Sequence, residues 1–260
     1  IPNDHFVDAI ALNHDVIMGD GSRVQFAVTQ PITDLKKVSI FRDGVEVLDG
    51  EVKVSDVNDR YIVFESPPGK GELITVLHKS WIAPLQNTNQ ATREEGEPFH
   101  AGNEGSGSIW YSFKAPTDGL LSVSTINSSF DTVLGMYMGD RVDRLNLVTF
   151  NDEDPALREM EDNPGLSRID QALEGGMEVY VAVDGFAGAR GVVSLLSSFE
   201  EGPIHRLSVS ANDGGKLVSA LTQPFNDADG SYTLFAHNGM VGLEVKPDGG
   251  NIFEGWQGSL

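Results

Sequence analysis

Oxygen-bearing side chains gather near residue 150, and their spacing suits a bound cation. Asn151, Asp152 and Asp154 follow one another at the end of an expected strand, and Asp131 stands on a segment expected to lie beside it. Alternate side chains of an extended chain point the same way, so Asp152 and Asp154 can face one ion. Calcium prefers about six to eight such oxygens. The alternative is an Asx-rich turn whose side chains bond their own backbone.

Motifs for catalysis are missing from the sequence. It contains no Gly-x-Ser-x-Gly elbow, no His-Glu-x-x-His pair and no phosphate-binding Gly-x-x-x-x-Gly-Lys loop. The histidines are scattered without ligand spacing: His5, His14, His78, His100, His205 and His237. His100 stands close to Glu97, where its expected role is to tie down its own loop. We therefore predict that the chain is not an enzyme.

Two adjacent aromatic residues could form a binding surface. Trp110 and Tyr111 lie on one expected strand, so one ring faces the core and the other faces the opposite side. An outward ring could stack on a sugar, or it could lie under a loop. We expect Trp81 to pack at a domain junction. We expect Trp256 to pack in the core of the module that contains it.

Charge and composition exclude several classes of partner. The net charge is −21, from 39 acidic and 18 basic residues, so the chain repels nucleic acids and anionic lipid surfaces. Cysteine is absent, which excludes disulfides and thiolate metal sites. There is no apolar run of about 18 residues, so we expect no membrane insertion. The acidity suits solubility outside the cell, or carboxylates that hold Ca²⁺.

Short strands recur along almost the whole chain. RVQFAVT (23–29), KVSIF (37–41) and RYIVF (60–64) are rich in β-branched and aromatic residues, and similar segments follow. Arg42-Asp43-Gly44 lies between two apolar runs and predicts a hairpin turn. Many short strands with close turns predict an all-β fold of tandem β-sandwich modules.

The middle of the chain resembles a known family. EEGEPFHAGNEGSGSIWYSF (94–113), FDTVLGMYMG (130–139), TFND (149–152) and YVAVDGF (180–186) occur in the order seen in bacterial pre-peptidase C-terminal (PPC-like) domains. The resemblance implies a jelly-roll-type β-sandwich found in large secreted proteins.

The opening motif of that family stands too early in this chain. NDHFVDAIAL (3–12) resembles the usual first strand, yet the rest of the family pattern begins much later. We interpret 1–12 plus 88–200 as one discontinuous PPC-like domain, with 13–87 inserted as a second domain. Such an insertion costs little conformational entropy where its two ends lie close together. The alternative is that residues 1–12 lead directly into an independent domain 13–87.

The flanking segments resemble two further module types. VSIFRDGVEV (38–47) is similar to bacterial immunoglobulin-like (Ig-like) sandwiches, so we assign 13–87 to that class. LSVSANDGG (207–215), VGLEVKP (241–247) and NIFEGWQG (251–258) resemble the InlB B-repeat, which assigns 201–260 to a small B-repeat-like sheet. That family continues into one more strand, so we expect this repeat to be truncated.

The PPC-like resemblance also implies a calcium site. Some relatives bind Ca²⁺ where the N-terminal stretch meets the loop before the first long strand. The matching oxygen ligands here are Asn3, Asp4, Glu97, Asn103 and Glu104. His100 departs from this pattern, because imidazole is a poor calcium ligand and would instead orient a carboxylate.

These features predict a non-catalytic adhesion, spacer or accessory binding region of a large secreted or cell-surface bacterial protein, stabilised by calcium. The expected partners are an extracellular polymer or protein ligand and further domains of the same parent chain. The alternative is a module that binds polysaccharide or fibrous protein for a secreted hydrolase.

Overall fold

The computed structural model describes residues 3–47, 50–155, 157, 165–209, 215–220, 225–226, 232–237, 243–247, 249–250, 252 and 254–255. In these ranges the regular secondary structure is almost entirely strand, arranged in several separate sheets, which confirms the prediction of tandem β-sandwich modules. Short 3-10 helices connect the strands: η1 (Phe6–Asp8), η2 (Leu35–Lys37), η3 (Thr88–Gln90), η4 (Val142–Arg144) and η5 (Phe186–Gly188). None of the helices in these ranges has the length and hydropathy that a membrane crossing requires.

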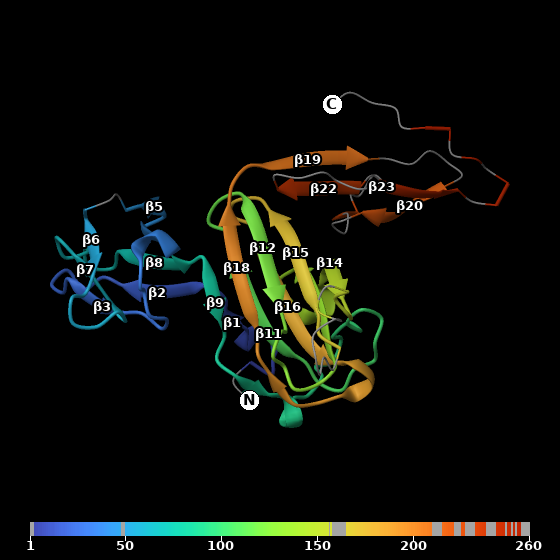
Figure 1. Cartoon of the computed structure of the whole chain (residues 1–260), viewed down its shortest axis with the longest axis horizontal. Helices are drawn as coiled ribbons and strands as arrows, with labels where there is room; N and C mark the ends of the chain where they lie inside the picture. Colours follow the sequence, from blue (N-terminus) through green and yellow to red (C-terminus); the bar gives the residue numbers. More distant parts are fainter. Residues whose placement is uncertain are drawn as a thin grey trace.

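The larger of two packed sandwiches, called the large sandwich below, occupies the middle of Figure 1. Its first sheet has the order β1-β11-β16-β13-β14, and its second has the order β15-β12-β18-β9. The first sheet contains β1 (Ile10–Ala11), β11 (Ile109–Lys114), β16 (Glu178–Gly185), β13 (Thr132–Met138) and β14 (Asn146–Asn151). The second contains β15 (Arg168–Leu173), β12 (Gly119–Ser124), β18 (Leu196–Glu201) and β9 (Ser80–Ile82). A further short ladder pairs β10 (Gln86–Asn87) with β17 (Val192–Val193).

Alternating apolar side chains form the core between these two sheets. In β12, for example, Leu121 and Val123 point inward and are fully buried, while Ser122 between them is half-buried on the outside. Phe113 from the first sheet contacts Phe199 from the second, with ring centroids 5.1 Å apart.

The N-terminal segment belongs to the first sheet of the large sandwich. β1 pairs in parallel with β11, and the Leu12 amide donates to the Ser112 carbonyl at 2.7 Å. Leu12 is fully buried in the core of the large sandwich. Residues 3–12 and the strand at 109–114 are therefore neighbours in space, although about a hundred residues separate them along the chain.

The second body, called the small sandwich, lies beside the large one in Figure 1. Its sheets have the orders β2-β8-β4-β5 and β3-β7-β6. The strands are β2 (His14–Met18), β3 (Gln25–Ala27), β4 (Val38–Arg42), β5 (Val45–Glu46), β6 (Val52–Val54), β7 (Tyr61–Phe64) and β8 (Leu73–His78). Between β4 and β5 the predicted turn is present: Asp43 and Gly44 have φ values of 47° and 80°, as a tight hairpin requires.

The strands just before residue 88 pair with the large sandwich. β9 pairs with β18 and β10 pairs with β17, on either side of Pro84. The predicted domain boundary at residue 87 assigns both strands to the inserted domain. The division into 1–12 plus 88–200, 13–87 and 201–260 stays a prediction, as do the family names given to the three parts.

After β18 the chain continues into further strands, drawn beyond one end of the large sandwich in Figure 1. One sheet has the order β19-β22-β21, from Ile204–Val209, Tyr232–His237 and Phe225–Asn226. A second ladder pairs β20 (Gly215–Ala220) with β23 (Leu243–Pro247). Trp256 and parts of the three B-repeat-like motifs lie outside the described residues.

Truncating Leu12 tests whether the N-terminal strand is part of the core. We expect Leu12→Ala to lower the free energy of unfolding by about 2–5 kcal/mol, because it opens a cavity among fully buried side chains. Leu85, which is 67% exposed, supplies the matched control, and Leu85→Ala should change stability by less than about 0.5 kcal/mol. Urea denaturation measures both. Equal, small effects would mean that residues 3–12 do not support the sandwich.

Candidate metal centres and the buried polar network

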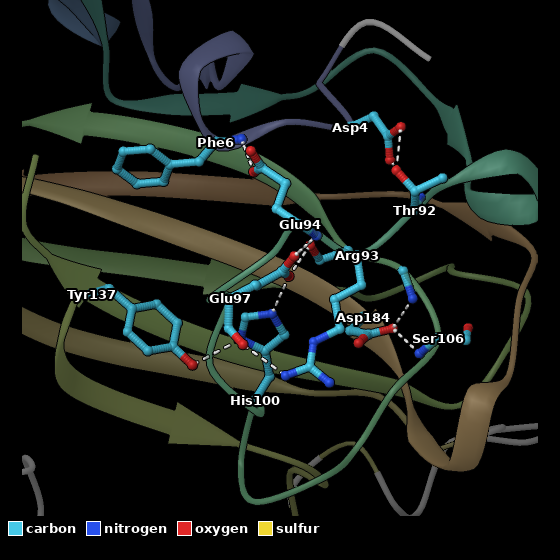
Figure 2. A network of polar contacts seen from close by, with 12 residues as sticks. Asp4, Phe6, Thr92, Arg93, Glu94, Glu97, His100, Ser106, Tyr137 and Asp184 are labelled. Atoms are coloured by element: carbon cyan, nitrogen blue, oxygen red, sulfur yellow. Dashed lines mark hydrogen bonds and ion pairs between the residues drawn. The ribbon is translucent and has the colours of Figure 1, made fainter. Parts of the chain in front are cut away.

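The first set of expected calcium ligands lies where the N-terminal segment and the loop 92–108 cross the outer face of the first sheet (Figure 2). The Asn3 side-chain amide donates to the Trp110 carbonyl at 3.0 Å, and the Trp110 amide donates back to the Asn3 carbonyl at 2.9 Å. Asn3 is fully buried, and its Oδ1 has no hydrogen-bond partner among the described residues.

Asp4 uses both carboxylate oxygens to hold the start of the loop. Its Oδ1 accepts the Thr92 backbone N–H at 2.6 Å, and its Oδ2 accepts the Thr92 hydroxyl at 3.0 Å. A second tie lies nearby, where the Phe6 backbone N–H donates to Glu94 Oε2 at 2.6 Å. These bonds fasten two segments that are far apart in sequence (Figure 2).

Glu97 lies at the centre of the network and is almost completely buried. Its Oε1 lies 2.9 Å from His100 Nε2 and also accepts the Ser108 hydroxyl, while its Oε2 accepts the Glu94 backbone N–H at 2.7 Å. Burial alone would raise the pKa of Glu97. The hydrogen bonds from His100, Ser108 and the Glu94 N–H outweigh it, so the pKa lies below the ordinary value of 4.5.

His100 continues the network to the sheet. Its Nδ1 lies 2.7 Å from the Tyr137 hydroxyl, so one imidazole joins a loop carboxylate to a side chain of β13. The ring packs edge-on against Trp110, with centroids 5.4 Å apart. Burial, followed by the nearby charges of Glu97 and Asp184, raises the pKa of the Tyr137 hydroxyl. The imidazole is therefore a buried connector between loop and sheet.

Asn103 and Glu104 lie further along the loop, and the Glu104 side chain is exposed. Asn103 Oδ1 accepts the Ala187 N–H at 3.2 Å. The Glu104 backbone carbonyl accepts a bond from Arg93, whose guanidinium also donates to the Glu97 carbonyl at 2.6 Å. The donor atoms of the first candidate set are therefore mostly occupied by protein N–H and O–H groups. They do not fit a calcium ion, which needs several of these oxygens to converge.

A buried carboxylate that the sequence did not single out holds the end of the same loop. Asp184 Oδ1, at the end of β16, accepts N–H bonds from Ser106, Gly107 and Gly185. The backbone of Gly105 approaches so closely that a Cβ there would lie 1.7 Å from Asp184 Oδ2. An acid followed by glycine at a strand end, opposite a Gly-Ser-Gly loop, is the only sequence signal for this contact.

The second candidate set lies where β13 and β14 meet the turn after residue 151. Asn151 Oδ1 accepts the Arg168 N–H at 3.0 Å, so this oxygen already holds β15. Asp154 is fixed through its backbone, because its N–H donates to the Leu166 carbonyl at 2.8 Å. Neither contact brings an oxygen of Asn151 or Asp154 toward a shared ion.

Asp131 and Asp152 form the part of this set that could attract a cation. Burial raises the pKa of Asp131, and the charges of Asp152 and Glu153 raise it further. Burial, followed by Glu153, raises the pKa of Asp152, and Asp152 Oδ1 is a buried oxygen without a hydrogen-bond partner among the described residues. Two carboxylates that repel each other can be relieved by protonation or by a cation. Among the described residues no group of three or more histidines and acids has a metal-binding arrangement.

The aromatic pair on β11 is covered on both sides. Tyr111 points into the core, whereas Trp110 lies on the outer face beneath Phe6 and His100; both are fully buried. Trp110 is thus covered by a loop and does not form a sugar platform. Trp81, on β9, packs edge-on against His78 at the boundary between the two sandwiches, with centroids 5.0 Å apart.

No protein-family model matches the chain, and no curated protein matches it. Several solved structures align with it, among them two weak matches. The uncharacterised protein lmo2446 from Listeria monocytogenes EGD-e, in complex with glucose, magnesium and calcium, is 16% identical over 72% of this chain and 19% of its own, with a TM-score of 0.25. An isomalto-dextranase from Arthrobacter globiformis T6, complexed with panose, is 11% identical over 71% of this chain and 34% of its own, with a TM-score of 0.29.

This chain therefore spans about a fifth and about a third of those two proteins. At such TM-scores neither alignment establishes a shared fold. The PPC-like, Ig-like and B-repeat-like resemblances stay predictions.

Acidification tests the role of Glu97. Because its pKa is lowered by folding, the stability it contributes is complete above about pH 4.5 and is lost as the pH falls through the lower, folded-state pKa. We expect Glu97→Gln to cost about 1–3 kcal/mol at pH 7 and to flatten the loss of thermal stability between pH 5 and 3. Glu95→Gln, an exposed neighbour in the same loop, should retain the wild-type pH profile. An unchanged profile in Glu97→Gln would disprove this role.

The repulsion between Asp131 and Asp152 can be tested by comparing the melting temperatures of wild type and Asp131→Asn in EDTA and in CaCl₂. Ionised Asp131 and Asp152 repel each other, and their raised pKa values mean that the folded state disfavours the doubly charged pair at pH 7. In EDTA we expect Asp131→Asn to melt higher than wild type. If calcium binds here, millimolar CaCl₂ should raise the wild-type melting temperature and leave that of Asp131→Asn unchanged. Equal calcium responses in wild type, Asp131→Asn and the exposed control Asp8→Asn would remove this site.

Proposed function

We propose that the chain is a non-catalytic spacer and adhesion region of a large secreted or cell-surface bacterial protein, in which the two sandwiches act as one stiff body. The observation that carries this proposal is the junction between them. The polypeptide crosses from one sandwich to the other twice, before β2 and after β8, and the two crossings are hydrogen-bonded to each other. A double crossing resists bending and twisting more than a single linker does.

Asn13 binds the two crossings together. Its side-chain amide donates to the His78 carbonyl at 2.8 Å, and the His78 backbone N–H donates to the Asn13 carbonyl at 2.7 Å. The Asn13 Oδ1 accepts the hydroxyl of Ser197, on β18 of the large sandwich. Asn13 is fully buried and has a φ of 61°, a conformation that asparagine tolerates better than most residues. One side chain thus joins both crossings to the large sandwich.

A histidine–carboxylate hydrogen bond is buried beside this connection. His78 Nε2 lies 2.8 Å from Asp15 Oδ2, and both side chains are less than a tenth exposed. The same carboxylate accepts the Thr29 N–H at 3.0 Å, so it also fixes the chain that follows β3. Breaking this bond would leave a buried polar group without a partner, and that cost favours one arrangement of this end of the small sandwich.

Apolar contact seals the junction. Leu77 and Phe41, on the outer face of the small sandwich, belong to the same buried cluster as Leu12 and Trp81 of the large one. At its margin the Ser39 hydroxyl donates to Glu201 Oε1 at 2.9 Å. A continuous core across two sheets favours a single relative orientation, because core packing tolerates few alternative arrangements.

The stiffness can be measured directly because the chain contains no native cysteine. Spin labels at Val57→Cys on the small sandwich and Thr117→Cys on the large one, both exposed positions, report the distance between the bodies. We expect pulsed electron paramagnetic resonance to give one narrow distribution of the distance between the two labels. A broad distribution in the wild-type background would contradict the proposal.

Asn13→Ala should loosen the same junction. It removes two buried hydrogen bonds, and we expect a loss of about 1–3 kcal/mol in unfolding free energy together with a broader label distance. Asn127→Ala is the matched control, because Asn127 has a similar φ of 68° but is exposed. Comparable losses in both variants would assign the effect to backbone conformation instead of to the junction.

A further inference from the structure

Strand β2 leaves one edge of the small sandwich open. It pairs with β8 alone, and no other described strand lies along its opposite edge. The His78 N–H donates to the Asn13 carbonyl, and the Gly19 N–H donates to the Glu72 carbonyl. Because bonded positions alternate in an antiparallel pair, the intervening odd-numbered residues also face β8. The N–H and C=O groups of Val16 and Met18 therefore point outward, toward the open edge.

The side chains at this edge are apolar and exposed. Val16 is 62% exposed and Met18 is 58% exposed, and Leu73, opposite Met18 on β8, is 39% exposed. This strip continues the outer face whose other end, at Leu77 and Phe41, is covered by the large sandwich. Ile17, which points the other way, is only partly buried against the small core. A strand added beside β2 would therefore cover apolar surface on both faces of the sheet: Val16 and Met18 on the outer face and Ile17 on the inner face.

Three other sheet edges of the two sandwiches, at β14, β15 and β9, carry features that block pairing. β14 contains a register shift opposite Met136 and Tyr137. β15 carries the exposed ion pair of Arg168 with Asp170. On β9 the carbonyl of Ile82 already accepts the Gln30 side chain.

β2 has an unbroken register of five residues with β8, no proline and no outward charge. Its single acid, Asp15, points inward and is bonded to His78 and Thr29. β2 therefore lacks the usual protection of an edge strand.

We propose that the β2 edge binds an extended, positively charged segment of a partner protein by adding it as a strand to the β2-β8-β4-β5 sheet. The unpaired backbone groups require an extended occupant, and the exposed strip requires apolar side chains at alternate positions. Charge selects the class of partner. The chain carries a net charge of −21, so two copies repel each other while a basic segment is attracted.

The inference deepens the proposed adhesion function by giving it a partner chemistry, and it rests on that function. Stiffness of the junction and binding at the edge are nevertheless separate properties of the chain. A narrow label distance without peptide binding would remove the edge inference alone, and a broad distance would remove the proposed function.

Three synthetic peptides of about nine residues, long enough for a typical strand, supply the test. The first alternates valine and threonine between lysine ends, the second replaces the lysines by glutamates, and the third repeats the basic peptide with alternate backbone nitrogens methylated. Titration against the whole chain is followed by fluorescence anisotropy. We expect the basic peptide to bind, and the acidic and methylated peptides to bind on the order of tenfold more weakly or not at all. Equal binding of the basic and methylated peptides would overturn strand addition, and so would no binding of the basic peptide.

Val16→Pro removes an outward N–H without breaking a bond to β8, because proline is tolerated where the N–H of an edge strand faces solvent. We expect it to weaken basic-peptide binding on the order of tenfold. The matched control is Val57→Pro, at a bend in the same sandwich where the side chain is 94% exposed, which should bind like wild type. Equal weakening by both prolines would overturn the location.

A second pair of variants keeps the test valid if Val16→Pro does not fold. Met18→Gln removes apolar surface without changing charge or any backbone donor, and Leu85→Gln does the same on the large sandwich. Only Met18→Gln should weaken binding. Sedimentation of the chain alone supplies a last check, because a dimer abolished by Met18→Gln would make a second copy the occupant and overturn the basic partner.

Discussion

The arrangement of the two sandwiches depends most on a buried amide, that of Asn13, at the place where the chain passes between them. An asparagine side chain can donate and accept at once, and here it donates to the His78 carbonyl and accepts from the Ser197 hydroxyl. An apolar residue of similar size would leave both partners unsatisfied in the interior, and a charged one would add a desolvation cost. The neighbouring Asp15–His78 pair and the apolar seal around Leu12 require the same arrangement, because each joins residues from both crossings or both sandwiches.

The four carboxylate side chains that are buried among the described residues serve one structural purpose. Asp4, Asp15, Glu97 and Asp184 are all less than a tenth exposed, and each accepts backbone N–H groups from a segment that would otherwise be a free loop. Hydrogen bonds to a charged acceptor are stronger than neutral ones, so a few acids can fix long connections without helices. The same bonds occupy the oxygens that a calcium ion would need. A high content of acids is therefore weak evidence for metal sites when loops are long and their amides must be satisfied.

The local strand pattern could be predicted from the sequence because it depends on near neighbours. RYIVF places Ile62 and Phe64 on one side, and both are buried; the turn at Asp43-Gly44 follows from the conformations those residues accept. Pairings over long separations leave no such signal. Thr92 is bonded to Asp4 and His78 to Asp15, and nothing in either local sequence names its partner. Pro84, a residue type that cannot donate to a strand ladder, separates two short strands that both pair with the large sandwich.

One end of β2 is anchored to the large sandwich and the other end is exposed. This contrast links the rigidity of the junction to binding at the β2 edge. At His14 the strand is anchored, since the imidazole bonds the Leu12 carbonyl at 2.7 Å and packs against Phe113 of the large sandwich. Four residues later, at Met18, the same strand is exposed and unpaired on its outer edge. A strand fixed at one end loses less conformational entropy when a partner pairs with the rest, because its backbone is already ordered. The rigid junction thereby lowers the entropic cost of binding at the edge, and force on a bound segment would pass along β2 into the core of the large sandwich.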